Sequence, residues 1–351
     1  MVAFGFACAL ILAELLLRAL TPLQLGFEYR DGRFGPPREF GIHSEVNAFG
    51  AHDAEPLAKA DGVQRVLLLG DSFVQGLAVS IEDTVARRLA HHLPGQGPGA
   101  FDVVSLAYGG ASPADELRLL RDAGSQLKPN RVISVFYAGN DVMQSMPAAE
   151  RETVLESGRV LPVFHGAAHV FGRDDARFFL VEESRLNQLI SQRVTVAARK
   201  RETAGVPIAF LVYSTSPDAP WHGASESAWA RVEDLLQETR AAAAALGADY
   251  GVVSVASSYA IGGEPQLEEM IASYPDMRGF GWDLEQPDER LAALCARDGI
   301  PFLSLLGGFR EGTRNSDSPL HWKYDRHWTP EGHDRAAREI SAFITNAENW
   351  R

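Results

Sequence analysis

The stretch RVLLLGDSFVQG, from Arg65 to Gly76, decides the fold of this chain. Four branched aliphatic residues, without polar alternation, are typical of a strand buried on both faces of a parallel sheet. The Gly-Asp-Ser that follows is typical of a tight turn, because glycine permits unusual backbone angles and short polar side chains bond local amides. Ser72 is therefore either a nucleophile on a turn after a buried strand or a polar residue in an ordinary loop. The stretch alone does not decide between them, and its turn chemistry favours the ordinary loop.

The same pattern recurs along the chain from Val66 onward. Short aliphatic runs alternate with longer amphipathic segments, which is typical of a parallel sheet covered by helices. The expected strands are residues 66–69, 101–106, 131–137, 207–213, 250–255 and 301–306. The expected helices are residues 82–93, 113–127, 181–203, 225–246, 284–298 and 330–347. The predicted fold class is α/β, with a central parallel sheet and helices on both faces.

One domain is expected over residues 63–351. Residues 147–180 do not follow the alternation of aliphatic runs and amphipathic segments. Within them, the sequence ETVLESGRVLPVF, which begins at Glu152, is typical of a hairpin. We therefore expect an insertion on the α/β core here rather than a second domain. Residues 21–62 are rich in glycine, proline and charge, which predicts a linker and loops that pack on the domain.

The first 20 residues are apolar except for Glu14 and Arg18. At about 1.5 Å per residue, a helix of this length just spans a bilayer core. The segment predicts a transmembrane anchor or an uncleaved signal helix, and a buried or amphipathic helix is the alternative. Basic residues follow the segment and none precedes it, which on the positive-inside rule favours the opposite orientation to export. We nevertheless expect a membrane-anchored protein whose catalytic domain is periplasmic or otherwise extracytoplasmic.

The bulk composition excludes some partners. The formal net charge is −13, which argues against nucleic acid, because phosphate binding needs clustered lysine and arginine. No cluster of residues has the ligand spacing of a zinc or calcium site. We therefore expect no metal, no cofactor and no nucleic-acid partner.

Candidate chemistry follows four of the expected strands. Ligands of open parallel sheets bind at the carboxyl ends of the strands, so these residues are expected to meet. Ser72 supplies a hydroxyl, and a hydroxyl nucleophile needs a base, a group that orients the base and donors for the oxyanion. His327 is the candidate base, and Asp325 is the candidate orienting group. The backbone N–H groups of Ser72 and Gly110 and the side-chain amide of Asn140 are the candidate oxyanion donors.

The order of these residues resembles that of the SGNH (GDSL-type) hydrolase superfamily. LGDSF resembles its first block, VVSLAYGGASPADEL the second, FYAGND the third and DRHWTPEGH the last. The resemblance runs from about Asn47 to the C-terminal helix. The resemblance implies a three-layer flavodoxin-like fold. It also implies that Ser72 is the nucleophile, His327 the base, and Gly110 and Asn140 oxyanion donors.

The chain departs from this family pattern at two places. The commonest last block has aspartate three residues before the histidine, where this chain has Tyr324. The Asp-x-His-Trp form present here resembles the variant of bacterial cell-envelope members, which include polysaccharide O-acetyltransferases. In the second block, Ser105 stands where the family usually has asparagine, and Ala107 stands where it often has glycine.

The function expected from these residues is hydrolysis of an O-acyl ester, acetyl or short-chain, on a small molecule or a carbohydrate. One alternative is a cell-envelope polysaccharide O-acyltransferase that uses the same site. A second is a non-catalytic, membrane-tethered carbohydrate-binding or assembly protein on an inherited hydrolase fold. An α/β-hydrolase is excluded, because Val74 stands where the Gly-x-Ser-x-Gly nucleophile motif needs its second glycine.

Four neighbouring residues have more ordinary expected roles. Asp71 is expected to fix the turn through backbone hydrogen bonds, and Asp141 to organise the Asn140 loop. His333 is expected to be a packed or capping residue rather than a second base. Trp328 is either a wall of the acyl pocket or a core aromatic residue.

Overall fold

A computed structural model provides the structure of the chain. It describes residues 5, 9–16, 28–30, 33–35, 46–76, 79–94, 100–157, 159–161, 205–315, 318–322 and 326–350.

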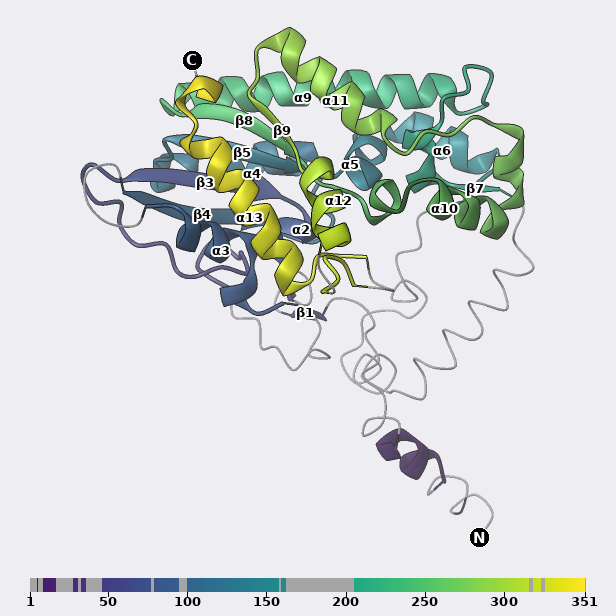
Figure 1. The fold of residues 1–351 in the computed structure, drawn as a ribbon, viewed down its shortest axis with the longest axis horizontal. Helices are drawn as coiled ribbons and strands as arrows, with labels where there is room; N and C mark the ends of the chain where they lie inside the picture. Colours follow the sequence, from purple (N-terminus) through teal and green to yellow (C-terminus); the bar gives the residue numbers. More distant parts are fainter. Residues whose placement is uncertain are drawn as a thin grey trace.

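The centre of the fold is a five-stranded parallel sheet with the order β4-β3-β5-β8-β9 (Figure 1). The first of these strands in the sequence, β3, lies between the second and the third, which is the flavodoxin-like order. Gly70 at the end of β3 is in register with Ala107 of β4 and Val135 of β5. The carboxyl ends of these three strands are therefore level. The strands are β3 (Gln64–Gly70), β4 (Phe101–Ala107), β5 (Arg131–Phe136), β8 (Asp249–Ser254) and β9 (Phe302–Ser304).

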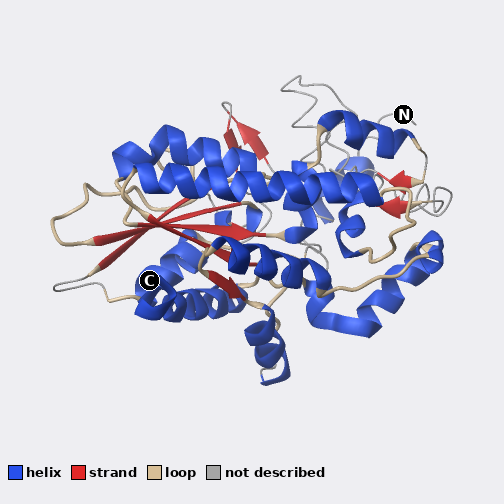
Figure 2. Cartoon of the chain, turned by 90° about the horizontal axis from the view of Figure 1, so that it is seen from above, coloured by secondary structure: helices blue, strands red, loops and turns tan. Residues whose placement is uncertain are grey.

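Helices cover both faces of the sheet, which completes a three-layer α/β architecture (Figure 2). Helices α3 and α13 contact each other on one face, while α4 and α9 contact each other on the other, where α11 also packs against β8 and β9. The predicted fold class is confirmed. The bounds of these helices are α3 (Val85–His92), α4 (Pro113–Leu127), α9 (His222–Ala245), α11 (Gln286–Asp298) and α13 (Pro330–Thr345).

Further elements connect and flank these layers. They are α2 (Ser72–Gln75), α5 (Ala138–Ser145), α6 (Ala148–Glu156), α10 (Ser258–Ser273), α12 (Leu306–Asn315), and the 3-10 helices η2 (Ile81–Asp83), η4 (Ile208–Tyr213), η5 (Pro275–Gly279) and η6 (Ala347–Trp350). Two further pairs of short strands lie outside the central sheet: β1 (Glu28–Arg30) with β2 (Arg33–Gly35), and β6 (Val160–Leu161) with β7 (Val206–Pro207).

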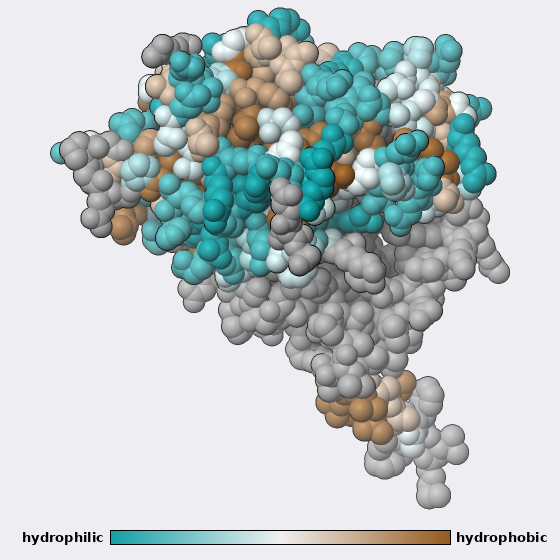
Figure 3. All heavy atoms as spheres, in the orientation of Figure 1, coloured by the Kyte–Doolittle hydropathy of each residue, from teal (hydrophilic) through white to brown (hydrophobic). Residues whose placement is uncertain are grey.

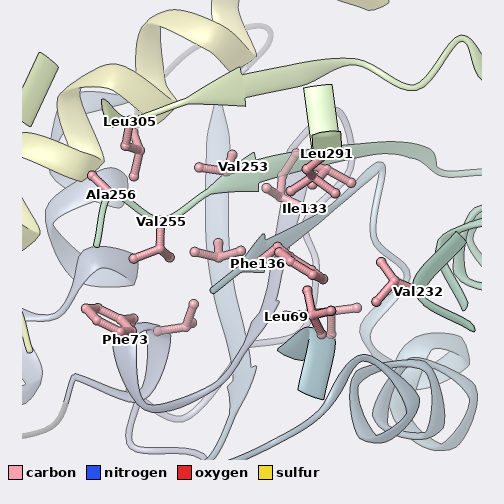
Figure 4. Packing of buried hydrophobic residues seen from close by; sticks show 14 of the residues in the cluster. Leu69, Phe73, Ile133, Phe136, Val232, Val253, Val255, Ala256, Leu291 and Leu305 are labelled. Atoms are coloured by element: carbon pink, nitrogen blue, oxygen red, sulfur yellow. The ribbon is translucent and has the colours of Figure 1, made fainter. Parts of the chain in front are cut away.

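The core lies between the sheet and its helices. The run Val66–Leu69 in β3 is fully buried, as expected for a strand covered on both faces. Figure 4 shows Leu69 and Phe136 near Val232 of α9, and Ile133 and Val253 beside Leu291 of α11. Burying each such aliphatic side chain stabilises the fold by roughly 1.5–3 kcal/mol.

The expected strand at residues 207–213 is wrong. These residues form the 3-10 helix η4, which packs against α5, and only Val206–Pro207 is extended, paired with β6 outside the central sheet. Most side chains of η4 are buried, including Phe210 and Tyr213. A short apolar run that is buried all round has no period, so its pattern does not separate strand from helix.

The expected hairpin at residues 152–164 is wrong in its first half, because Glu152–Glu156 belong to helix α6. Alanine, glutamate and arginine are good helix formers, and Glu150 in the first turn complements the helix dipole. The rest of the expected insertion, residues 162–180, and the expected helix at 181–203 lie outside the described residues.

Helix α4 was predicted with its observed bounds, 113–127, because both ends carry sequence signals. Ser112 and Asp115 form a reciprocal capping box, and Pro113 occupies the first turn, where its missing N–H costs nothing. Lys128, in a left-handed conformation, ends the helix.

The loop that leads into β3 packs on the sheet through Asp53. Its carboxylate accepts hydrogen bonds from the backbone N–H and the hydroxyl of Ser105 in β4, at 2.8 and 3.1 Å, and pairs with Arg87 at 2.7 Å. In the same loop, His52 Nδ1 lies 2.8 Å from the backbone oxygen of Gln75. The loop is thus tied to both β4 and α2.

Near the N-terminus, residues 9–16 are helical and expose Leu10, Ile11, Leu12, Leu15 and Leu16 (Figure 3). Among the residues that the structure describes, no helix has both the length and the apolar character needed to cross a membrane.

Candidate active site

Ser72 lies on a sharp turn between β3 and the short helix α2. Asp71 caps this helix, because its Oδ1 accepts a hydrogen bond from the backbone N–H of Phe73 at 2.9 Å. Gly70 is required for the close approach of strand and helix, since a Cβ there would lie 2.4 Å from a methyl carbon of Val74. The turn therefore places Ser72 in the first turn of α2, where N–H groups have no acceptor inside the helix.

His327 is held by backbone hydrogen bonds that link the residues before α13. The backbone N–H of Trp322 donates to the carbonyl of His327 at 2.8 Å, and the N–H of Arg326 donates to the carbonyl of Trp322 at 3.1 Å. Arg326 has a positive φ of 74°, which closes the turn next to His327. Thr329 then caps α13 by accepting a hydrogen bond from the N–H of Gly332. The histidine is thus fixed by the backbone hydrogen bond from Trp322 on one side and followed by a capped helix on the other.

These two turns bring Ser72 and His327 together across 255 residues of sequence. His327 Nε2 lies 2.7 Å from Ser72 Oγ, and Ser72 is 7% exposed. The ring of Phe73 packs against the imidazole, with 4.9 Å between the ring centroids. With its proton on Nδ1, a neutral His327 is an acceptor for the serine hydroxyl, which is the arrangement of an activated nucleophile.

Asn140 lies in the first turn of α5, next to the end of β5. Its Nδ2 donates to Asp71 Oδ2 at 2.8 Å, so the turn after β3 and the turn after β5 are joined by a side-chain hydrogen bond. Asp141 accepts a hydrogen bond from the backbone N–H of Tyr137 at 2.7 Å, which is the role expected for it in organising this loop. Because β3 and β5 are neighbours, Asn140 lies at the topological switch point of the sheet.

Gly110 lies in the turn after β4 and has a φ of +74°. A Cβ at this position would meet only the side-chain amide of Gln144, at 4.0 Å, so conformation rather than lack of space favours glycine here. That same amide donates to the carbonyl of Gly110 at 3.4 Å, which links the turn to α5. The three turns that carry Ser72, Gly110 and Asn140 thus follow adjacent strands with level ends.

The remaining residues singled out in the last sequence block are either buried packing residues or not described. Asp325, the predicted orienting acid, and Tyr324 lie outside the described residues. Trp328 is fully buried and packs on Phe73 and Phe309, so it is a core aromatic residue. His333 is buried, and its Nδ1 accepts a hydrogen bond from the backbone N–H of Val85 at 3.1 Å, so it is a packed residue rather than a second base.

Three buried carboxyl groups lie behind the site. Burial raises the pKa of Asp71, although the N–H of Phe73, the Asn140 amide and the nearby His327 oppose the shift. Burial and the charge of Asp71 raise the pKa of Asp141 well above its ordinary value. Burial also raises the pKa of Glu116 to about 8.

Glu116 was not among the residues expected at the site, although the sequence carries a signal for it. It shares one face of α4 with Leu120, Ala123 and Leu127, because these residues recur at helical spacing and are buried. A glutamate on the apolar face of an amphipathic helix marks a buried carboxyl group. The described residues contain no group of three or more side chains arranged to hold a metal ion.

Comparison with known proteins identifies one family. The family model described as GDSL-like Lipase/Acylhydrolase family matches residues 68–335, more than half of the chain. No curated protein matches the sequence.

Solved structures with a similar fold include an acetylxylan esterase from Geobacillus stearothermophilus, at 14% identity and a TM-score of 0.41, with 80% of this chain and 94% of that chain covered. A psychrotrophic esterase from Pseudoalteromonas sp. has 11% identity and a TM-score of 0.38, with 82% and 99% covered. TesA has 13% identity and a TM-score of 0.39, with 80% and 98% covered.

Proposed function

Because this chain belongs to the GDSL-like lipase/acylhydrolase family and is therefore an ester-hydrolysing enzyme, we propose that Ser72 is its nucleophile and His327 its general base. One observation supports this assignment above the others: the 2.7 Å contact between Ser72 Oγ and His327 Nε2. The contact joins the two groups that a serine hydrolase needs, at the carboxyl edge of a parallel sheet, where such folds bind their ligands.

The reaction begins with transfer of the Ser72 hydroxyl proton to His327 Nε2, while Oγ attacks the ester carbonyl. The oxyanion of the tetrahedral intermediate accepts hydrogen bonds from the N–H groups of Ser72 and Gly110 and from the Asn140 amide. One N–H of that amide is held by Asp71, so the other is the one available to the oxyanion. His327 then protonates the leaving alcohol, and water, activated by the same imidazole, releases the acyl group.

Asp325 is proposed as the residue that orients His327, on the sequence argument that it lies two positions before it. A carboxylate on Nδ1 would fix the tautomer that leaves Nε2 free to accept the serine proton. Asp325→Asn should therefore lower kcat with little change in KM. Equal kcat for the variant and the unmodified enzyme would remove Asp325 from the mechanism.

The proposed substrate is an acetyl or other short-chain O-acyl ester of a small molecule or a carbohydrate. Acyl transfer to a sugar hydroxyl is the second candidate function, favoured by the Asp-x-His-Trp form of the last block. Both reactions share the acyl-enzyme, so an acceptor decides between them. Excess oligosaccharide should leave the rate of acetate release unchanged if the enzyme is a hydrolase, and should yield acetylated oligosaccharide instead if it is a transferase.

Residues 1–20 are proposed to anchor the protein in a membrane, with the catalytic domain outside the cytoplasm. Support comes from the apolar sequence and from the exposed leucine and isoleucine side chains of residues 9–16. The full chain should sediment with membranes and resist salt extraction, whereas a chain that begins after residue 20 should not. Full release of the intact chain by salt would refute the anchor.

The proposed nucleophile is tested with an activated acetyl ester and a fluorophosphonate probe. Ser72→Ala should lower kcat on the order of a millionfold and abolish labelling. Ser225→Ala is the matched control, because Ser225 is 8% exposed and Ser72 7%, and Ser225 lies in α9. Labelling that survives in Ser72→Ala, or that is absent from the unmodified enzyme, would refute the assignment.

A further inference from the structure

Helix α10, which follows β8, is broken at Gly263. This residue has a φ of 61° and a ψ of −144°, which is not helical, and Pro265 beyond it has no N–H to continue the hydrogen-bond ladder. Tyr259 therefore lies on the first part of α10, residues 258–262, and Gln266 on the second part, residues 264–273. Because the backbone ladder is interrupted between the two parts, other contacts must set their relative position.

The first part of α10 is fixed to the rest of the domain. Ser257 caps it by accepting a hydrogen bond from the N–H of Ala260 at 3.0 Å, and Arg310 of α12 donates to the carbonyl of Ala260 at 2.8 Å. Just before the helix, the carbonyl oxygen of Ala256 lies 3.1 Å from Nε2 of His321. This end of α10 is therefore a firm support beside the residues that precede the proposed base.

Arg326 contacts both parts of α10. Its guanidinium carbon lies 5.4 Å from the centroid of the Tyr259 ring, within the range of a cation–π contact. Its Nη1 donates a hydrogen bond to Gln266 Oε1 at 3.1 Å. The Tyr259 ring packs edge-on against Phe210 of η4, with 5.4 Å between the ring centroids, so the arginine rests on an ordered surface. One side chain thus spans the break in the helix, and it belongs to the residue directly before His327.

The backbone of Arg326 indicates that its side chain has a purpose. Its φ of 74° lies in the left-handed region, which costs free energy for a residue with a side chain and almost none for glycine. The N–H of Arg326 donates to the carbonyl of Trp322, whose own N–H donates to the carbonyl of His327. Glycine would suit this backbone better, so the contacts with α10 are what the arginine adds.

Building on the proposed function, we propose that Arg326 is a positioning residue that fixes the imidazole of His327 relative to Ser72. Its contacts with Tyr259 and Gln266 hold the residue before the histidine against both parts of α10. They thereby keep the imidazole at its 2.7 Å separation from the serine hydroxyl. A displacement of about 1 Å at a reacting group can cost about 100-fold in rate, so a small shift of Arg326 is enough to slow the reaction.

The test compares three variants of the full chain at Arg326, with an activated acetyl ester as the substrate. The rate is expressed per active serine, counted by complete labelling with a fluorophosphonate probe. Arg326→Ala should lower this rate by up to about 100-fold, because it removes both contacts with α10. Arg326→Lys should recover most of the rate, because an ammonium group also donates to an amide oxygen and lies over an aromatic ring.

Arg326→Gly separates the contribution of the side chain from that of the backbone. Glycine relieves the left-handed conformation, so this variant should have a higher urea midpoint than Arg326→Ala. It still lacks the contacts with α10, so its rate per active serine should be as low as that of Arg326→Ala. A residue with a merely structural role would instead change the number of active serines and leave the rate of each one unchanged.

A double-mutant cycle tests the route through α10. Gln266→Leu should lower the rate in the unmodified enzyme and change it little in Arg326→Ala, because the contact is already lost there. Arg131→Ala is the matched control, since the Arg131 guanidinium lies 4.5 Å from the ring centroid of Trp350, at the start of β5 and away from the carboxyl ends of the strands. It should hydrolyse the ester at the unmodified rate per active serine.

The outcomes separate this inference from the proposed function. Absence of both labelling at Ser72 and ester hydrolysis in the unmodified enzyme overturns the proposed function, and this inference with it. An unmodified rate per active serine in Arg326→Ala or in Arg326→Gly overturns this inference alone, as does an effect of Gln266→Leu that is equally large with and without Arg326. Loss of rate in Arg326→Ala and Arg326→Gly, with recovery in Arg326→Lys, supports it.

Discussion

Replacing Gly332 by alanine should move the loop that carries His327. Gly332 is buried in the first turn of α13, and a Cβ there would lie 2.1 Å from the backbone oxygen of Leu320 and 3.0 Å from Cβ of Trp328. The Leu320 oxygen also accepts a hydrogen bond from the N–H of Thr329, so it is fixed from two sides. The clash is with backbone, and it must be relieved by displacing the loop before His327 or the helix after it.

The expected magnitude has two opposing parts. Overpacking of this kind costs about 1–3 kcal/mol, whereas alanine is favoured over glycine in a helix by about 1 kcal/mol. Gly223→Ala in the first turn of α9 isolates the second part, because a Cβ there meets nothing within 4 Å. The two variants should therefore differ by about 1–3 kcal/mol in the free energy of unfolding, with Gly332→Ala the less stable.

Urea unfolding gives the stabilities, and the rate of fluorophosphonate labelling reports the position of His327 relative to Ser72. A displacement of about 1 Å at a reacting group can cost about 100-fold in rate, so labelling of Gly332→Ala should slow by up to this factor. Gly223→Ala should label at the rate of the unmodified enzyme. The same urea midpoint and the same labelling rate in the two alanine variants would refute a clash at Gly332.

Three further predictions test other contacts. Burial lowers the pKa of His333 from 6.5 to about 3, so the unfolded chain takes up a proton that the folded chain does not, and stability is lost as the pH falls from 6.5 toward 3. His333→Gln should reduce this loss of stability by up to about 1.4 kcal/mol per pH unit, measured from urea midpoints. An unchanged slope of stability against pH would contradict the prediction. Gly110→Ala and Gly247→Ala should each cost about 1–2 kcal/mol of stability, because the backbone φ at these positions is 74° and 73°. Only Gly110→Ala should slow ester hydrolysis. Equal hydrolysis rates for the two variants would remove Gly110 from the oxyanion site. Asn140→Ala should lower kcat by about 10²–10³ with little change in KM, and a change confined to KM would show that the amide contacts the bound ester rather than the oxyanion.

The central sheet was predictable because its strands are apolar on both faces. Val66–Leu69 favoured a covered strand, because the run is short, branched and followed by a glycine turn. Residues 208–213 are also a short apolar run, but they form a buried 3-10 helix. What decides between the two is the neighbouring helix α5, and a contact between distant segments leaves no local pattern.

The proximity of the turns after β3, β4 and β5 was predictable for a different reason. Parallel strands bring their carboxyl ends to one edge, so the order of elements alone places Ser72 near Asn140. The bond between Asn140 and Asp71 was not predictable, because it depends on the rotamers of two side chains on separate turns. The surroundings of Glu116 were equally hidden, because helical spacing shows that it faces inward but not which groups it meets there.

The loop before α13 has a consequence for how the enzyme is made. Ser72 follows the first strand of the sheet to be synthesised, whereas its histidine partner lies 255 residues later. During translation, the proposed nucleophile emerges long before its proposed base, so a partly made chain should carry an inert serine. Hydrolysis by a nascent or proteolytically clipped chain would thus report that the two ends of the domain had joined.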